Sequence, residues 1–132
     1  MSEFSRAQLT LALGHHIAQK VIGSDGALDP RELALLHDVY PRARMEAAGF
    51  VSEQGHFTPS FEEAARMAMT ALPGLLDADE KRALLRDWYM LAMADKTYTR
   101  SEDVVLHRAG EVLGLDVEQV DALLVEFQLE VG

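Results

Sequence analysis

The sequence predicts an all-α fold, a compact bundle of about six or seven helices. Apolar residues recur at the three- and four-residue spacing of amphipathic helices, and no segment shows the strict alternation of a half-buried strand. Capping signals precede these stretches, and one helix-loop-helix unit occurs twice, so we expect an internal pseudo-repeat. Because 132 residues suit one hydrophobic core, we expect residues 1–132 to form a single domain.

The first two helices have strong start signals. Ser5 with Gln8 forms a capping box before apolar residues at fourfold spacing, which predicts a helix over 6–22. The run Asp29-Pro30-Arg31-Glu32 predicts a second helix, with Asp as N-cap, Pro at the first position and Glu at the third. Pro41 should interrupt that helix.

The middle of the chain is less regular. Residues 41–49 are expected to form a short helix. Residues 50–57 carry aromatics beside glycines without a helical period, so we expect them to be the most mobile or exposed segment. Thr58-Pro59 should cap the next helix, and Pro73-Gly74 should end it.

Three more helices are predicted in the second half. Their start or stop residues are Asp77 or Asp79, Thr99 with Glu102, Gly114, and Asp116 with Gln119. The apolar face of the first is Leu84, Trp88, Leu91 and Ala92, and that of the last is Val117, Val120, Leu124 and Phe127.

A loop is repeated at an offset of 70 residues (95 − 25). Its copies are Asp25-Gly26-Ala27-Leu28-Asp29-Pro30-Arg31-Glu32 and Asp95-Lys96-Thr97-Tyr98-Thr99-Arg100-Ser101-Glu102. The same offset pairs Val21 with Leu91, Leu35 with Val105, Leu36 with Leu106, and His37 with His107. This agreement indicates a duplicated helix-loop-helix unit.

Composition narrows the classes of partner. Lys plus Arg is 12 and Asp plus Glu is 22, a net charge of −10, and no stretch concentrates basic residues, so we expect no nucleic-acid partner. The absence of cysteine excludes disulfides, thiolate metal sites and cysteine nucleophiles. The polar start of the chain indicates neither a signal peptide nor a membrane span, and we expect a cytoplasmic location with no integral membrane segment.

The repeated motif, Ser24-Asp25-Gly26 with Glu32 and Ala94-Asp95 with Glu102, resembles the TerB-like family of tellurite-resistance proteins. The same domain type occurs at the amino terminus of a membrane-anchored J-domain co-chaperone. The resemblance runs from about His15 to about Leu124, and Lys96 departs from the Gly usual after the first Asp. It implies a compact helical bundle and a role in the response to tellurite or another chemical stress.

The candidate site is the set of four repeated carboxylates, Asp25, Glu32, Asp95 and Glu102. Capping alone can explain Glu32 and Glu102, because a carboxylate at the third helical position bonds free amides and complements the helix dipole. If the repeat brings its loops together, the four carboxylates form a cluster suited to calcium, magnesium or manganese. The spacing is not that of an EF-hand. Capping and ion binding both remain open.

The favoured function is a non-enzymatic binding or scaffolding module of a stress-response system. It would act through an acidic surface formed by the two loops, with Asp25 and Asp95 as the principal residues, a protein as the partner, and a divalent cation as an aid. The alternative is a metal-dependent enzyme that uses the same carboxylates in a concave pocket. No catalytic residue, no other cofactor and no oligomeric state is predicted.

Overall fold

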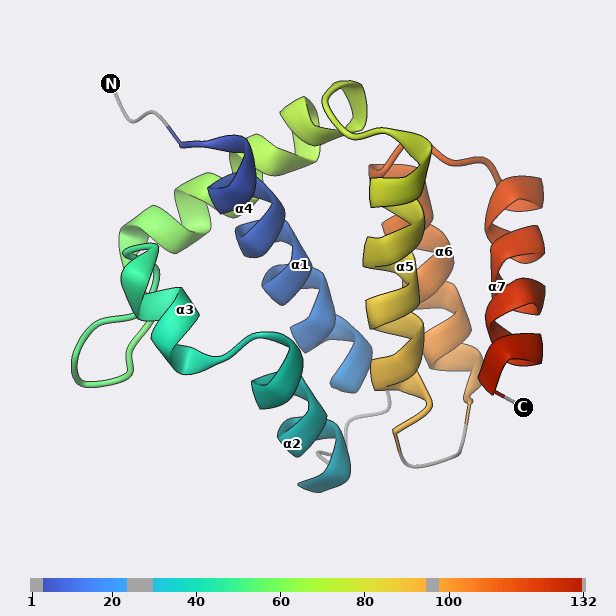
Figure 1. Ribbon diagram of the computed structural model, residues 1–132, viewed down its shortest axis with the longest axis horizontal. Coiled ribbons are helices and arrows are strands. Elements are labelled where there is room, and N and C mark those ends of the chain that lie inside the picture. The colour runs from blue at the N-terminus through green and yellow to red at the C-terminus, as the bar shows by residue number, and fades with distance from the viewer. Residues whose placement is uncertain (1–3, 24–29, 95–97, 132) are drawn as a thin grey trace.

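The computed structural model describes residues 4–23, 30–94 and 98–131 of the chain (Figure 1). These residues form seven α-helices and one short 3-10 helix, and the only extended pairing among them is an isolated β-bridge between Val51 and Phe57. The helices are α1 (Arg6–Ile22), α2 (Pro30–Val39), α3 (Arg42–Ala47), α4 (Pro59–Ala71), the 3-10 helix η1 (Leu72–Gly74), α5 (Ala78–Ala92), α6 (Arg100–Val112) and α7 (Val117–Val131). The predicted all-α class and number of helices are therefore confirmed.

Local capping chemistry sets most helix starts where the sequence places them. At α1 the Gln8 amide donates to Ser5 Oγ at 3.1 Å, and the Ser5 amide donates to Gln8 Oε1 at 2.9 Å. The same reciprocal pairs begin three further helices, namely Asp77 with Glu80, Thr99 with Glu102, and Asp116 with Gln119. The expected cap Asp29 lies outside the described residues.

Two helix pairs keep the predicted offset. Helices α1 and α5 end at Ile22 and Ala92, and α2 and α6 begin at Pro30 and Arg100, so both boundaries differ by 70 residues (92 − 22 and 100 − 30). Helix α1 packs on α5, and each of them also packs on the second helix of the other pair. This exchange is the pattern of a pseudo-twofold arrangement. In Figure 1 the first helix of each pair ends, and the second begins, toward the lower end of the bundle.

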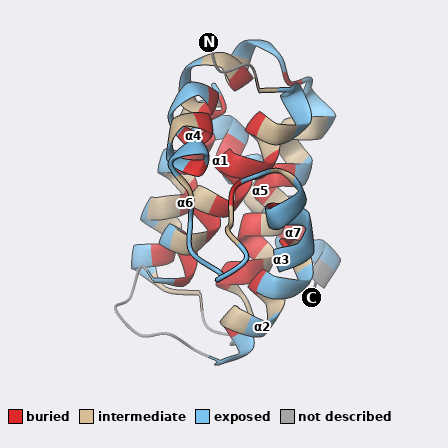
Figure 2. Ribbon diagram, turned by 90° about the vertical axis from the view of Figure 1, so that its left-hand side faces the viewer, coloured by how far each residue is buried: buried red, intermediate tan, exposed pale blue. Residues whose placement is uncertain are grey.

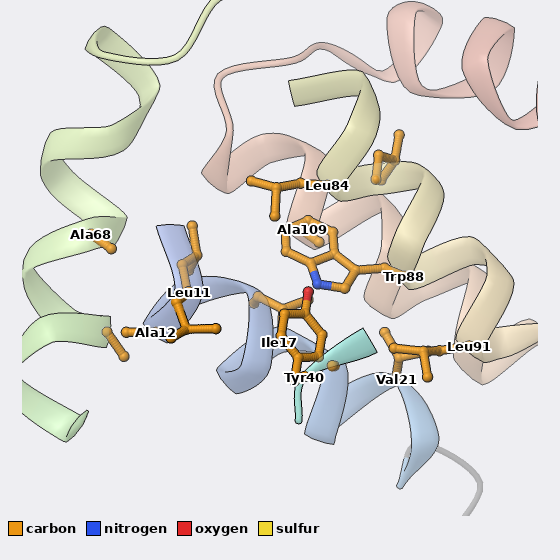
Figure 3. Packing of buried hydrophobic residues seen from close by; sticks show 14 of the residues in the cluster. Leu11, Ala12, Ile17, Val21, Tyr40, Ala68, Leu84, Trp88, Leu91 and Ala109 are labelled. Atoms are coloured by element: carbon orange, nitrogen blue, oxygen red, sulfur yellow. The ribbon is translucent and has the colours of Figure 1, made fainter. Parts of the chain in front are cut away.

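The core is centred where α1 crosses α5 (Figures 2 and 3). Trp88 of α5 is fully buried, and its indole N–H donates to the carbonyl of Gly14 in α1 at 2.9 Å. A Cβ at Gly14 would lie 2.6 Å from Tyr40 Oη, so glycine permits the ring of Tyr40 to close over α1. Helix α4 covers another side of α1, and α7 covers α5 and α6.

Three local expectations need correction. Residues 50–57 are not wholly exposed, because Phe50 is fully buried and its ring lies 5.8 Å from that of Phe61, although residues 53–57 do face solvent. Thr58 precedes α4 as predicted, but its hydroxyl donates to the Gly49 carbonyl at 2.6 Å instead of capping the helix. Val117, the first residue of α7, is 56% exposed and does not line the core.

Candidate functional site

Glu32 and Glu102 are the two predicted site residues that the structure describes. Each is the third residue of its helix, α2 or α6, and each is only 2% exposed. Asp25 and Asp95 lie outside the described residues, so the meeting of all four carboxylates stays a prediction. The described pair nevertheless has matched positions and matched burial, as a duplicated unit requires.

The helix geometry places both glutamates at one end of the bundle. Helices α1 and α5 both run toward the lower end in Figure 1, where α2 and α6 begin. The first turns of α2 and α6 direct free amide groups and the positive ends of their dipoles toward this end. Negative charge is therefore favoured there twice, at equivalent places in the repeat.

Capping explains the position of these glutamates but not their burial. At α6 the Thr99 amide donates to Glu102 Oε1 at 2.8 Å, which completes a capping box. Gln8, Glu80 and Gln119 occupy the same third position in other helices, and none of them is buried. Because a buried carboxylate is stable only with compensating partners, the burial of Glu32 and Glu102 is a property beyond capping.

Metal-ligating side chains do not gather elsewhere in the described ranges. Over residues 4–23, 30–94 and 98–131, no group of three His, Asp or Glu side chains is placed to hold a metal ion. The predicted site for calcium, magnesium or manganese therefore depends on Asp25 and Asp95 joining Glu32 and Glu102.

Two cavities have linings that sequence reasoning missed. One, of about 320 Å³, lies between α1 and α2 beside Phe57, and its polar residues are His15, Gln19 and His37. The other, of about 220 Å³, lies between α1 and α5 near Tyr40, and Asp87 and Arg44 are among its residues. Burial raises the pKa of the Asp87 carboxyl, and Arg86 and Arg44 oppose this rise.

His15 is a buried histidine in an aromatic setting. Its ring lies 5.5 Å to 5.7 Å from those of Tyr40, Phe57 and Phe61, all in edge contacts, and its Nδ1 is 2.8 Å from Gln19 Nε2. The sequence contains a pattern that indicates this burial. Leu11, His15, Ala18 and Ile22 form a second stripe along the helix over 6–22. Helix α1 is buried on two faces, since α4, α5 and α6 all pack on it.

The titration of His15 should make the fold less stable in acid. Burial lowers the pKa of His15 from 6.5 to about 4. The unfolded chain therefore binds a proton that the folded chain does not, and the free energy of unfolding falls as the pH drops through this window. Between pH 7 and pH 4 we expect the wild type to lose about 3 kcal/mol by this route, a loss absent from His15→Phe.

Urea titrations at several pH values measure this effect, with His56→Gln as the control because His56 is exposed. Equal pH slopes for the wild type and His15→Phe would contradict the assignment.

His107, which the repeat matches to His37, lies between charged neighbours. His107 Nδ1 is 2.8 Å from the Asp103 carbonyl oxygen, and its Nε2 is 2.7 Å from Asp121 Oδ1 of α7. Burial lowers the pKa of His107, but the Asp103 carbonyl and the Asp121 carboxylate outweigh burial and raise it overall. Its repeat mate His37 is exposed at the rim of the larger cavity, so the two copies differ here.

Comparison with known proteins agrees with the fold and the repeat. Residues 17–124 match the family described as TerB, tellurite resistance protein TerB. No curated protein and no solved structure matches the chain. In the described part of the chain, no helix combines the length and the apolar character that crossing a membrane would need. Since the match covers most of the sequence, including both copies of the repeated loop, the chain belongs to the TerB family of tellurite-resistance proteins.

Proposed function

We propose that the chain is a non-enzymatic binding module of a tellurite or chemical-stress response system. It recruits a protein partner through an acidic surface at the end of the bundle where α1 turns into α2 and α5 turns into α6. Membership of the TerB family supports the response system. The single observation that supports a shared role for this end is the matched burial of Glu32 and Glu102, each 2% exposed, and the accessible negative charge of the proposed surface comes from Asp25 and Asp95.

The two buried glutamates support a division of roles. Glu32 and Glu102 anchor the first turns of α2 and α6, and the repeated Asp25 and Asp95 provide the ligand-facing charge. A divalent cation with oxygen preference, such as calcium, magnesium or manganese, then links the loops and completes the surface. An ion held between two loops, and not by one chelating segment, should bind weakly.

Calorimetric titration with calcium, magnesium and manganese chlorides tests the proposal. We expect at least one ion to bind the wild type with a Kd of about 0.1–1 mM, as in weak protein calcium sites. Asp25→Asn with Asp95→Asn should abolish the heat while leaving helicity intact. Asp79→Asn with Glu118→Gln is the matched control, because it removes two exposed charges elsewhere.

Two results would reject the ion or the roles assigned to the aspartates. No heat and no change of thermal midpoint with any of the three ions would reject the ion. Loss of helicity in the Asp25 and Asp95 double variant would show that these residues are structural.

A further inference from the structure

Helix α7 has apolar residues on two opposite faces. Its inner face holds Val120 and Phe127, which are 1% and 0% exposed against α5 and α6. Leu129 follows Val120 by nine residues, and at 3.6 residues per turn this places it on the opposite side of the helix. Ala122, Val125 and Leu129 lie along that side at positions i, i+3 and i+7, and we call them the outer ridge.

The outer ridge faces solvent. Val125 is 57% exposed and Leu129 is 80% exposed, and α5 and α6 are the principal neighbours of α7. Figure 1 shows α7 at the edge of the bundle, with its other side open. Single apolar side chains on a surface are ordinary, but a helix that is apolar on opposite faces is typical of one packed on both sides.

The charge of α7 indicates which kind of partner the outer ridge would bind. Helix α7 carries Glu118, Asp121, Glu126 and Glu130 and no Lys or Arg. Glu126 and Glu130 pair with Arg82 and Arg86 of α5 on the inner side, at 2.5 Å to 3.0 Å. Glu118 and Asp121 stand one turn before Ala122 and Val125. Asp121 also contacts His107 of α6, with Oδ1 2.7 Å from Nε2, but its side chain is still 59% exposed, so acidic charge borders the ridge itself.

A second copy of the chain is a poor occupant. It would bring together two chains of net charge −10 and two helices without a basic residue. A helix with an apolar stripe between Lys and Arg residues meets both features of the ridge, because its stripe covers Val125 and Leu129 and its flanks face Glu118 and Asp121.

We propose that the outer ridge of α7 docks an amphipathic helix of a partner protein whose apolar stripe is flanked by basic residues. This surface is separate from the one at the turns of the repeat. It also extends past residue 124, where the match to the TerB family ends, so Val125 and Leu129 belong to this chain beyond the shared region.

Amide chemical-shift mapping tests the proposal on the full chain. The probe is a synthetic helical peptide with Leu along one stripe and Lys on both flanks, and the comparison peptide has Glu in place of Lys. We expect the Lys peptide to shift the amides of α7, the Glu peptide to leave them unchanged, and Val125→Ser with Leu129→Ser to weaken binding at least about tenfold. Met67→Ser with Leu75→Ser, at two apolar sites that are 39% and 49% exposed elsewhere, should bind as the wild type does.

Three outcomes would overturn the proposal. The Lys peptide could shift residues outside α7, or it could bind the ridge variant and the wild type equally. In the third outcome, sedimentation shows that the wild type is a dimer and that the Val125→Ser, Leu129→Ser variant is a monomer. The occupant of the ridge is then a second copy of the chain. Unchanged circular dichroism of the Ser variants keeps the comparison valid, because both ridge positions face solvent.

Discussion

Trp88→Ala should lower the free energy of unfolding by about 3–5 kcal/mol, which is a large part of the 5–15 kcal/mol typical of a domain. Trp88 is the one tryptophan of the chain, and it is fully buried where α5 crosses α1. Its removal leaves a cavity between the two copies of the repeat and deletes the donor to the Gly14 carbonyl. The thermal midpoint should fall by roughly 10–20 °C.

Trp88→Phe separates the hydrogen bond from the volume. Phe keeps most of the ring but has no donor for Gly14, so we expect a cost of about 1–2 kcal/mol. Leu75→Ala is the control, because Leu75 is 49% exposed and should lose less than about 0.5 kcal/mol. Circular dichroism in urea measures all three variants without relying on tryptophan emission. A cost below about 1 kcal/mol for Trp88→Ala would contradict the central place given to the α1 and α5 crossing.

Glu102→Ala should cost about 2 kcal/mol, and Glu32→Ala should cost a similar amount. Alanine removes the oxygen that accepts from the Thr99 amide at 2.8 Å, and it leaves a gap at a residue that is 2% exposed. Equal costs are expected because the two glutamates have the same position and the same burial in the repeat.

Glutamine is the informative replacement, because the chain already uses it at this position. Gln8 and Gln119 each accept from the N-cap amide at 2.9 Å in α1 and α7. Glu102→Gln should therefore keep the cap and cost less than about 1 kcal/mol. Gln119→Ala is the control for loss of an exposed cap. If Glu102→Gln proves as costly as Glu102→Ala, the fold depends on the negative charge and capping is not the structural role of Glu102.

Features that depend on neighbouring residues were predictable from the sequence. The capping boxes at Ser5 and Thr99 involve groups three residues apart, so helix starts follow from the chain alone. The repeat could be predicted for the same reason. Two copies of one local sequence pattern are expected to form the same local structure. The TerB resemblance was visible in these copies and is confirmed by the match over residues 17–124.

Features that depend on packing were not predictable. Phe50 looks like a loop residue, but the rings of Phe61 in α4 and of Phe4 both pack against it in the fold. Glu32 and Glu102 look like ordinary surface caps in the sequence, and their burial becomes visible only in the folded bundle. The outer ridge of α7 was not distinguishable from the sequence, because apolar residues lie on more than one side of this helix and its inner face becomes known only when α5 and α6 are in place.

Manganese titration followed by amide NMR tests most directly whether the duplicated loops share one surface. Mn²⁺ broadens the signals of nearby nuclei. One ion between the loops should therefore broaden the amides at the start of α2, around Glu32, and those at the start of α6, around Glu102, at the same low Mn²⁺ concentration. Both effects should disappear together in Asp25→Asn with Asp95→Asn. Broadening confined to one helix start, or none at either, would contradict a shared site.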